Sequence, residues 1–99
     1  MNENTERRIE QMQTIHNELL ALFVKKNIDY GDSFAEYGPV GVLIRIGDKL
    51  KRLETITKNG VALVDEEALR DTAIDLANYA VMLVMLLDEN NLNESGAAS

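Results

Sequence analysis

Residues 66–90, EEALRDTAIDLANYAVMLVMLLDEN, decide the fold class of this chain. Apolar residues recur in the stretch at intervals of three and four, which is typical of an α-helix. One apolar seam consists of Leu69, Ala73, Leu76, Ala80, Leu83 and Leu87. A second flank consists of Ile74, Ala77, Val81 and Val84. A helix that is apolar on nearly every side is buried from several directions. We therefore expect at least a dimer, with this helix near the interface.

Two further helices are predicted on the N-terminal side of this stretch. Residues 5–26 carry apolar side chains at helical intervals, and residues 39–58 begin with Pro39 and end before Asn59 and Gly60. Proline is favoured in the first turn of a helix, and glycine just after its last turn. Residues 27–38 are predicted as a long loop, which is often functional at that length. The expected fold is all-α, a three-helix unit assembling into a helical-bundle homo-oligomer. One domain is predicted over residues 1–90, with a disordered tail at 91–99.

Composition and charge exclude several classes of function. The 99 residues hold 10 Lys and Arg against 17 Asp and Glu, a formal net charge of −7, and no cysteine. An acidic surface repels nucleic acid backbones, so broad nucleic-acid binding is not expected. The longest apolar stretch, residues 73–87, is too short for a membrane span and includes Asp75 and Asn78. The N-terminus has no apolar signal segment. We expect a cytoplasmic protein without disulfides.

Two polar stripes interrupt the apolar faces of the second and third predicted helices. At about 100° per residue, each stripe covers a sector of about 80–100°. The first stripe consists of Arg45, Asp48, Lys49 and Arg52. The second consists of Glu67, Asp71, Asp75 and Asn78. Carboxylates stacked at four-residue intervals repel one another, so something has to compensate their charge.

Two kinds of compensation are available to these acids. In the first, Asp71 and Asp75 form inter-helix salt bridges with basic residues, the candidates being Arg45, Lys49, Arg52 and Arg70. In the second, Asp48, Asp71 and Asp75 hold Mg²⁺, which prefers oxygen ligands and keeps waters for substrate phosphates. The bases then contact phosphate oxygens. Spacing alone favours the salt bridges, but Asp75 stands in an otherwise apolar run and needs a cation or hydrogen-bond donors.

Three strings in the sequence carry a family resemblance. They are KKNIDYGDSF at 25–34, RIGDKLKRL at 45–53 and the segment 66–80. In this order they resemble the nucleotide-modification-associated domain of phage and bacterial proteins, over roughly residues 25–87. That domain is in turn similar to the MazG-like all-α nucleoside triphosphate pyrophosphohydrolases. Those enzymes are helical oligomers that use Mg²⁺ to split a (d)NTP into its monophosphate and pyrophosphate.

The resemblance implies roles for individual residues. Asp48, Asp71 and Asp75 are the implied metal ligands, with Glu36 or Glu67 as possible additions. The implied catalytic residues, which stabilise charge on the phosphate oxygens, are Lys49 and Arg52. The implied substrate-binding residues are Lys26, Asn27, Tyr30, Arg45 and Asn78, with Tyr30 stacking on the base.

Arg45 departs from the pattern of the MazG-like enzymes, because it stands where an acid is expected. That departure favours an alternative, a non-catalytic nucleotide-binding protein, for which a phage gene is one origin. A purely structural helical oligomer is the third hypothesis, in which both stripes are engaged in salt bridges. The first hypothesis is a Mg²⁺-dependent nucleoside triphosphate pyrophosphohydrolase-like protein.

Overall fold

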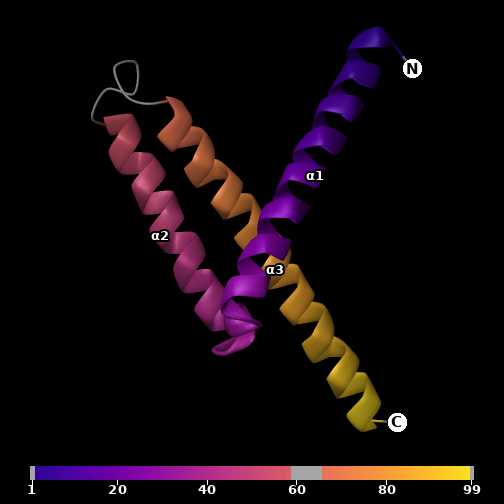
Figure 1. Ribbon diagram of the computed structural model, residues 1–99. Helices are drawn as coiled ribbons and strands as arrows, with labels where there is room; N and C mark the ends of the chain where they lie inside the picture. The colour runs from indigo at the N-terminus through magenta and orange to yellow at the C-terminus, as the bar shows by residue number, and fades with distance from the viewer. Residues whose placement is uncertain (1, 59–65, 99) are drawn as a thin grey trace. The chain divides into compact units, whose positions relative to one another are not determined.

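The computed structural model is helical throughout its regular structure (Figure 1). It describes residues 2–58 and 66–98, and for residues 29, 30 and 91–98 it describes the backbone alone. The elements are α1 (Glu3–Tyr30), the 3₁₀-helix η1 (Ser33–Ala35), α2 (Gly38–Lys58) and α3 (Glu66–Ala98). These described ranges contain no strand, so the prediction of an all-α protein with three main helices is confirmed.

The contacts divide the chain into two compact units. The first, Met1–Gly31, holds α1, and the second, Asp32–Ser99, holds η1, α2 and α3. The sequence predicted one domain over residues 1–90. Each unit is described by itself below.

Helix α1 is longer than the predicted helix at both ends. The side chain of Asn2 caps its start by accepting a hydrogen bond from the Thr5 amide at 2.8 Å. At the other end Gly31 adopts a φ of 64°, and its amide donates to the Asn27 carbonyl at 2.7 Å. The predicted end at Lys26 was too early, because residues 27–30 contain no helix breaker. Gly31 is the first residue there that readily accepts a positive φ.

Helix α2 has the predicted bounds to within one residue. It begins at Gly38, which has a φ of 66°, and Pro39 occupies its first turn. The short η1 packs against α2. The predicted stop signal at Asn59 and Gly60 lies outside the described residues.

Helices α2 and α3 pack against each other and form the core of the second unit. Val42 of α2 is 2% exposed, the lowest value among the apolar core residues. From α3 the buried apolar side chains are Ile74, Met82 and Leu86. Their spacing places the core on one side of α3.

Helix α3 continues to Ala98, past its predicted end near Asn90. The backbone of the predicted disordered tail is therefore helical as far as Ala98. Residues 91–98 contain no proline, so main-chain hydrogen bonds can continue through them. Within the described ranges, none of the helices has the length and apolar character needed to cross a membrane.

Candidate functional site

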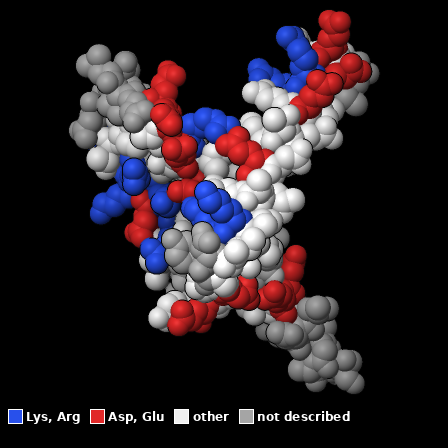
Figure 2. Space-filling model, in the orientation of Figure 1, with Lys and Arg blue, Asp and Glu red and all other residues white. Residues whose placement is uncertain are grey.

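Helix α2 presents two different sides in the second unit. Its side toward α3 carries buried or half-buried residues, namely Val42, Ile46, Lys49, Leu53 and Ile56. A neighbouring side carries three exposed charged residues, Arg45, Asp48 and Arg52, which we call the charged strip of α2. Basic and acidic side chains lie interspersed on the surface over α2 in Figure 2. The first predicted stripe is therefore split, with Lys49 turned inward and the other three members exposed.

Lys49 and Asp75 connect the two predicted stripes. The Lys49 Nζ atom lies 3.3 Å from Asp75 Oδ2, and each side chain is 25% exposed. Inter-helix salt bridges with several candidate bases were one of the two alternatives for Asp75, and the structure pairs Asp75 with Lys49. Because Asp75 stands among apolar residues of α3, a nearby ammonium lowers the energy of its carboxylate there.

The remaining polar residues of α3 differ in burial. Asp71 and Glu67 are exposed, whereas Thr72 and Asn78 are 3% and 8% exposed. The Thr72 hydroxyl donates to the Ala68 carbonyl at 2.7 Å, within the same helix. Every buried side-chain nitrogen or oxygen of the described residues has a hydrogen-bond partner. Asn78, predicted to bind substrate, is thus a buried residue of α3.

The acids predicted as metal ligands are not gathered into one cluster. Across residues 2–58 and 66–98, no three His, Cys, Asp or Glu residues form a group that could hold a metal ion. Asp75 contacts Lys49, while Asp48 and Asp71 are exposed on α2 and α3. Mg²⁺ is usually held by one or two carboxylates together with substrate phosphates and waters. Mg²⁺ binding by these acids stays a prediction.

The three remaining predicted residues belong to the first unit. Lys26 is exposed and Asn27 is half-buried, both near the end of α1. Tyr30 is the last residue of α1, and its side chain lies outside the described part. Their predicted contact with substrate stays a prediction.

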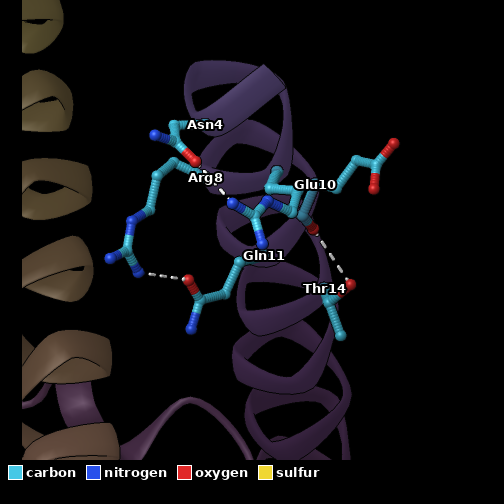
Figure 3. A pocket seen from close by; sticks show the side chains of 6 residues that line it. Asn4, Arg8, Glu10, Gln11 and Thr14 are labelled. Carbon is cyan, nitrogen blue, oxygen red and sulfur yellow. Dashed lines mark hydrogen bonds between the residues drawn. The ribbon is translucent and has the colours of Figure 1, made fainter. Parts of the chain in front are cut away.

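A hollow on the first turns of α1 was not predicted (Figure 3). It is lined by Asn4, Arg7, Arg8, Glu10, Gln11 and Thr14. Arg7 donates to the Asn4 side-chain oxygen, and Arg8 donates to Gln11 Oε1 at 2.9 Å. The sequence feature that could have predicted it is the pair Arg7 and Arg8. Asn4 lies three residues before Arg7, and Gln11 lies three residues after Arg8. These bonds join exposed residues of one helix, and the hollow contains no buried charged group.

Comparison with known proteins identifies one family. The sequence model described as nucleotide modification associated domain 1 matches residues 26–87. No curated protein and no solved structure matches the chain. The matched span contains all of α2, α3 as far as Leu87, and every residue predicted to bind or act on a nucleotide, but not the hollow on α1.

Proposed function

This chain belongs to the nucleotide modification associated domain 1 family, and on that premise we propose that it binds a nucleotide by its phosphates. The charged strip of α2 supports the proposal, because Arg45 and Arg52 are exposed there and lie inside the matched span. Guanidinium groups can bind phosphate oxygens through two hydrogen bonds at once. The two arginines are seven positions apart, about 10.5 Å along a helix, so both can reach one nucleotide through flexible side chains.

The observation that carries this proposal is the Lys49–Asp75 ion pair. Lys49 of the predicted α2 stripe is engaged in this pair, and Arg45 and Arg52 remain as the exposed cations of the stripe. The pair also joins α2 to α3, so the two arginines extend from a helix that is fixed on its inner side. A fixed support reduces the entropy lost when a ligand binds.

A second function is proposed on the basis of the exposed Asp48 and Asp71. This is Mg²⁺-dependent hydrolysis of a (d)NTP to its monophosphate and pyrophosphate, as in the MazG-like enzymes, a likeness inferred from the sequence alone. When bound, Mg²⁺ supplies charge neutralisation on the phosphates and lowers the pKa of a coordinated water. Asp48 and Asp71 are the residues suited to hold it, and Arg52 is suited to stabilise charge on the phosphate oxygens.

The proposal also includes association between copies of the chain. Four large apolar residues of α3 are between 37% and 55% exposed, namely Val81, Val84, Met85 and Leu87. A chain of about 100 residues buries little more than 60% of its unfolded surface by itself. Covering these residues with a second copy would remove apolar surface from water.

The binding proposal is tested with a matched pair of double variants. Arg45→Ala/Arg52→Ala removes the exposed cations of α2, and Arg7→Ala/Arg8→Ala removes two cations from α1, outside the matched span. Titration calorimetry with the standard NTPs and dNTPs, in EDTA, is expected to show binding to the wild type and the α1 variant. We expect the α2 variant to bind at least about tenfold more weakly, since hydrogen bonds to charged groups contribute about 1.5–3 kcal/mol each. If both variants lose the same affinity, the loss comes from the change in net charge, and this result would contradict the proposed site.

The same preparations separate the two functions. Pyrophosphate released in Mg²⁺ and absent in EDTA would establish hydrolysis. Binding that survives EDTA without turnover would leave the protein as a nucleotide binder. Neither binding nor turnover with any of the standard nucleotides would overturn both functions and leave the structural oligomer.

A further inference from the structure

Tyr37 stands just before α2, and its side chain lies at the surface. It is 78% exposed, more than the other large hydrophobic side chains described in the second unit. An aromatic side chain contributes most to folding when its large apolar area is buried. Packing among the described residues of this unit therefore does not account for an aromatic ring at this position.

Gly41 shows where the Tyr37 side chain points. A Cβ atom added at Gly41 would lie 2.7 Å from the Tyr37 Cβ atom, 3.7 Å from its Cγ atom and 3.9 Å from its Cδ2 atom. Side chains four positions apart in a regular helix have their Cβ atoms about 5–6 Å apart. Gly38, between the two residues, has a φ of 66°, which interrupts the helical path there. The Tyr37 side chain is thus folded over the first turn of α2, in space that a side chain at Gly41 would occupy.

Gly41 is in line with the charged strip of α2. The positions Gly41, Arg45, Asp48 and Arg52 are separated by four, three and four residues. At about 100° per residue, they fall within a sector of about 60°. Arg45 is one turn from Gly41, about 6 Å along the helix axis. The Tyr37 ring therefore lies at one end of the charged strip, and the first charged side chain after it is an exposed arginine.

An exposed ring followed by exposed arginines matches the two ends of a nucleotide, which carries a flat aromatic base and a chain of phosphates. Aromatic side chains stack on bases of any identity, and guanidinium groups bind phosphate oxygens. We infer that Tyr37 is the base-stacking residue of the nucleotide site, with Arg45 and Arg52 on the phosphates. The ligand class is therefore a nucleotide of any base, bound through base and phosphates together.

The inference rests on the proposed phosphate binding by α2 and adds the contact that distinguishes a nucleotide from an inorganic phosphate. Tyr37 and both arginines lie in the second unit and inside the matched span. The resemblance implied Tyr30 for stacking, and that residue belongs to the first unit. Because a base and its phosphates are covalently joined, a ring and cations positioned by one unit can bind both ends at once.

Tyr37→Leu and Tyr37→Phe test the stacking, with Tyr30→Leu as the matched control. The ligands are ATP and inorganic triphosphate, titrated by calorimetry in EDTA. Tyr37→Leu should weaken ATP binding about tenfold, which is within the range for stacking of one base on an aromatic side chain. It should leave the affinity for inorganic triphosphate unchanged. Tyr37→Phe keeps the ring and should bind both ligands like the wild type, as should Tyr30→Leu.

Tyr37→Trp gives a direct reading of the contact, because the chain has no tryptophan of its own. Since residue 37 is exposed, this variant and Tyr37→Leu should fold like the wild type, which circular dichroism checks. The fluorescence of the single indole should be quenched by ATP, whose base can stack on it. Inorganic triphosphate has no base and should leave the fluorescence unchanged.

The outcomes separate base stacking from phosphate binding. Unchanged ATP affinity in Tyr37→Leu would overturn the inference, and so would a loss of ATP affinity confined to Tyr30→Leu. ATP binding to Tyr37→Trp without quenching would overturn it as well. In these three cases phosphate binding by α2 would stand. An equal loss of ATP and inorganic triphosphate in Tyr37→Leu would also count against stacking, because it would place the effect on the phosphates. A wild type that binds neither ligand would overturn the proposed function and this inference together.

Discussion

Helices α2 and α3 pack on each other but place their polar side chains differently. In α2 the charged residues Arg45, Asp48 and Arg52 are exposed. In α3 the polar residues Thr72 and Asn78 are buried. Exposed charges contribute little to folding and are available to a ligand, whereas buried polar groups must be satisfied for the chain to fold. The difference suggests that α2 supplies recognition and α3 supplies a scaffold.

Lys49 is a charged residue of α2 that is only 25% exposed, and its removal should have the largest effect on stability. Lys49→Met keeps the aliphatic stem and removes the ammonium beside Asp75. Breaking a fully buried ion pair costs about 3–5 kcal/mol, and here a quarter of each side chain remains exposed, so we expect about 1–3 kcal/mol. The melting temperature should fall by about 4–8 °C per kcal/mol in a domain of this size. Thermal unfolding followed by circular dichroism measures the change.

Arg52→Met is the matched control for Lys49→Met. Arg52 is exposed three residues further along the same helix, so its removal should change the unfolding free energy by at most about 0.5 kcal/mol. The two variants should behave in opposite ways with a nucleotide, Arg52→Met losing affinity and Lys49→Met losing mainly stability. If Arg52→Met is as unstable as Lys49→Met, the distinction between the exposed and inner members of the stripe is wrong.

Asn78→Ala tests the scaffold role of α3 and has the next largest expected effect. Asn78 is 8% exposed, so its replacement by alanine removes a buried side chain together with the polar interaction it makes, at about 1–2 kcal/mol. Urea unfolding should detect this, and nucleotide titration of the same variant should show nearly unchanged affinity. The reverse result, unchanged stability with weakened binding, would support the substrate-binding role predicted from the sequence.

Thr72→Val should have a smaller effect, because the Thr72 hydroxyl bonds a carbonyl of its own helix. We expect a loss of about 0.5–1 kcal/mol on urea unfolding. Thr55→Val is a matched control, since the Thr55 hydroxyl makes the same kind of bond to the Lys51 carbonyl at 3.0 Å but is exposed. If Thr55→Val and Thr72→Val lower the unfolding free energy equally, the burial of Thr72 on α3 does not determine how much its hydroxyl contributes to stability.

The sequence predicted the helices better than it predicted their ends. Periodicity placed α2 to within one residue, because Pro39 and the following glycine and asparagine signals bracket it. It missed four residues of α1 before Gly31 and the continuation of α3 to Ala98, where no proline or cap marks a boundary. Polar composition at the C-terminus suggested disorder, although composition alone does not prevent helical hydrogen bonding.

The site was predictable as a set of residues but not as contacts. Spacing placed Lys49 in the same sector as Arg45 and Arg52, and the base that reaches Asp75 depends on how α2 is rotated against α3. A rotation of about 100° exchanges one residue position for the next. Burial of Asn78 depends on the same rotation. Packing between the helices, rather than the pattern within either one, sorts the stripe into an ion pair and an exposed strip.

Asp71 has the smallest expected effect and tests whether α3 is only a scaffold. It is exposed one turn from both Glu67 and Asp75, so Asp71→Asn relieves like-charge repulsion. Unfolding in low salt should show a gain of a few tenths of a kcal/mol, which disappears at about 1 M salt, where the Debye length is about 3 Å. Glu67→Gln should show a smaller gain, because Glu67 is one turn from Asp71 alone. The two variants should differ in their response to Mg²⁺ only if Asp71 holds the ion beside a bound nucleotide. In that case Asp71→Asn, but not Glu67→Gln, should lose the stabilisation that Mg²⁺ adds to a nucleotide complex, and α3 would contribute to recognition after all.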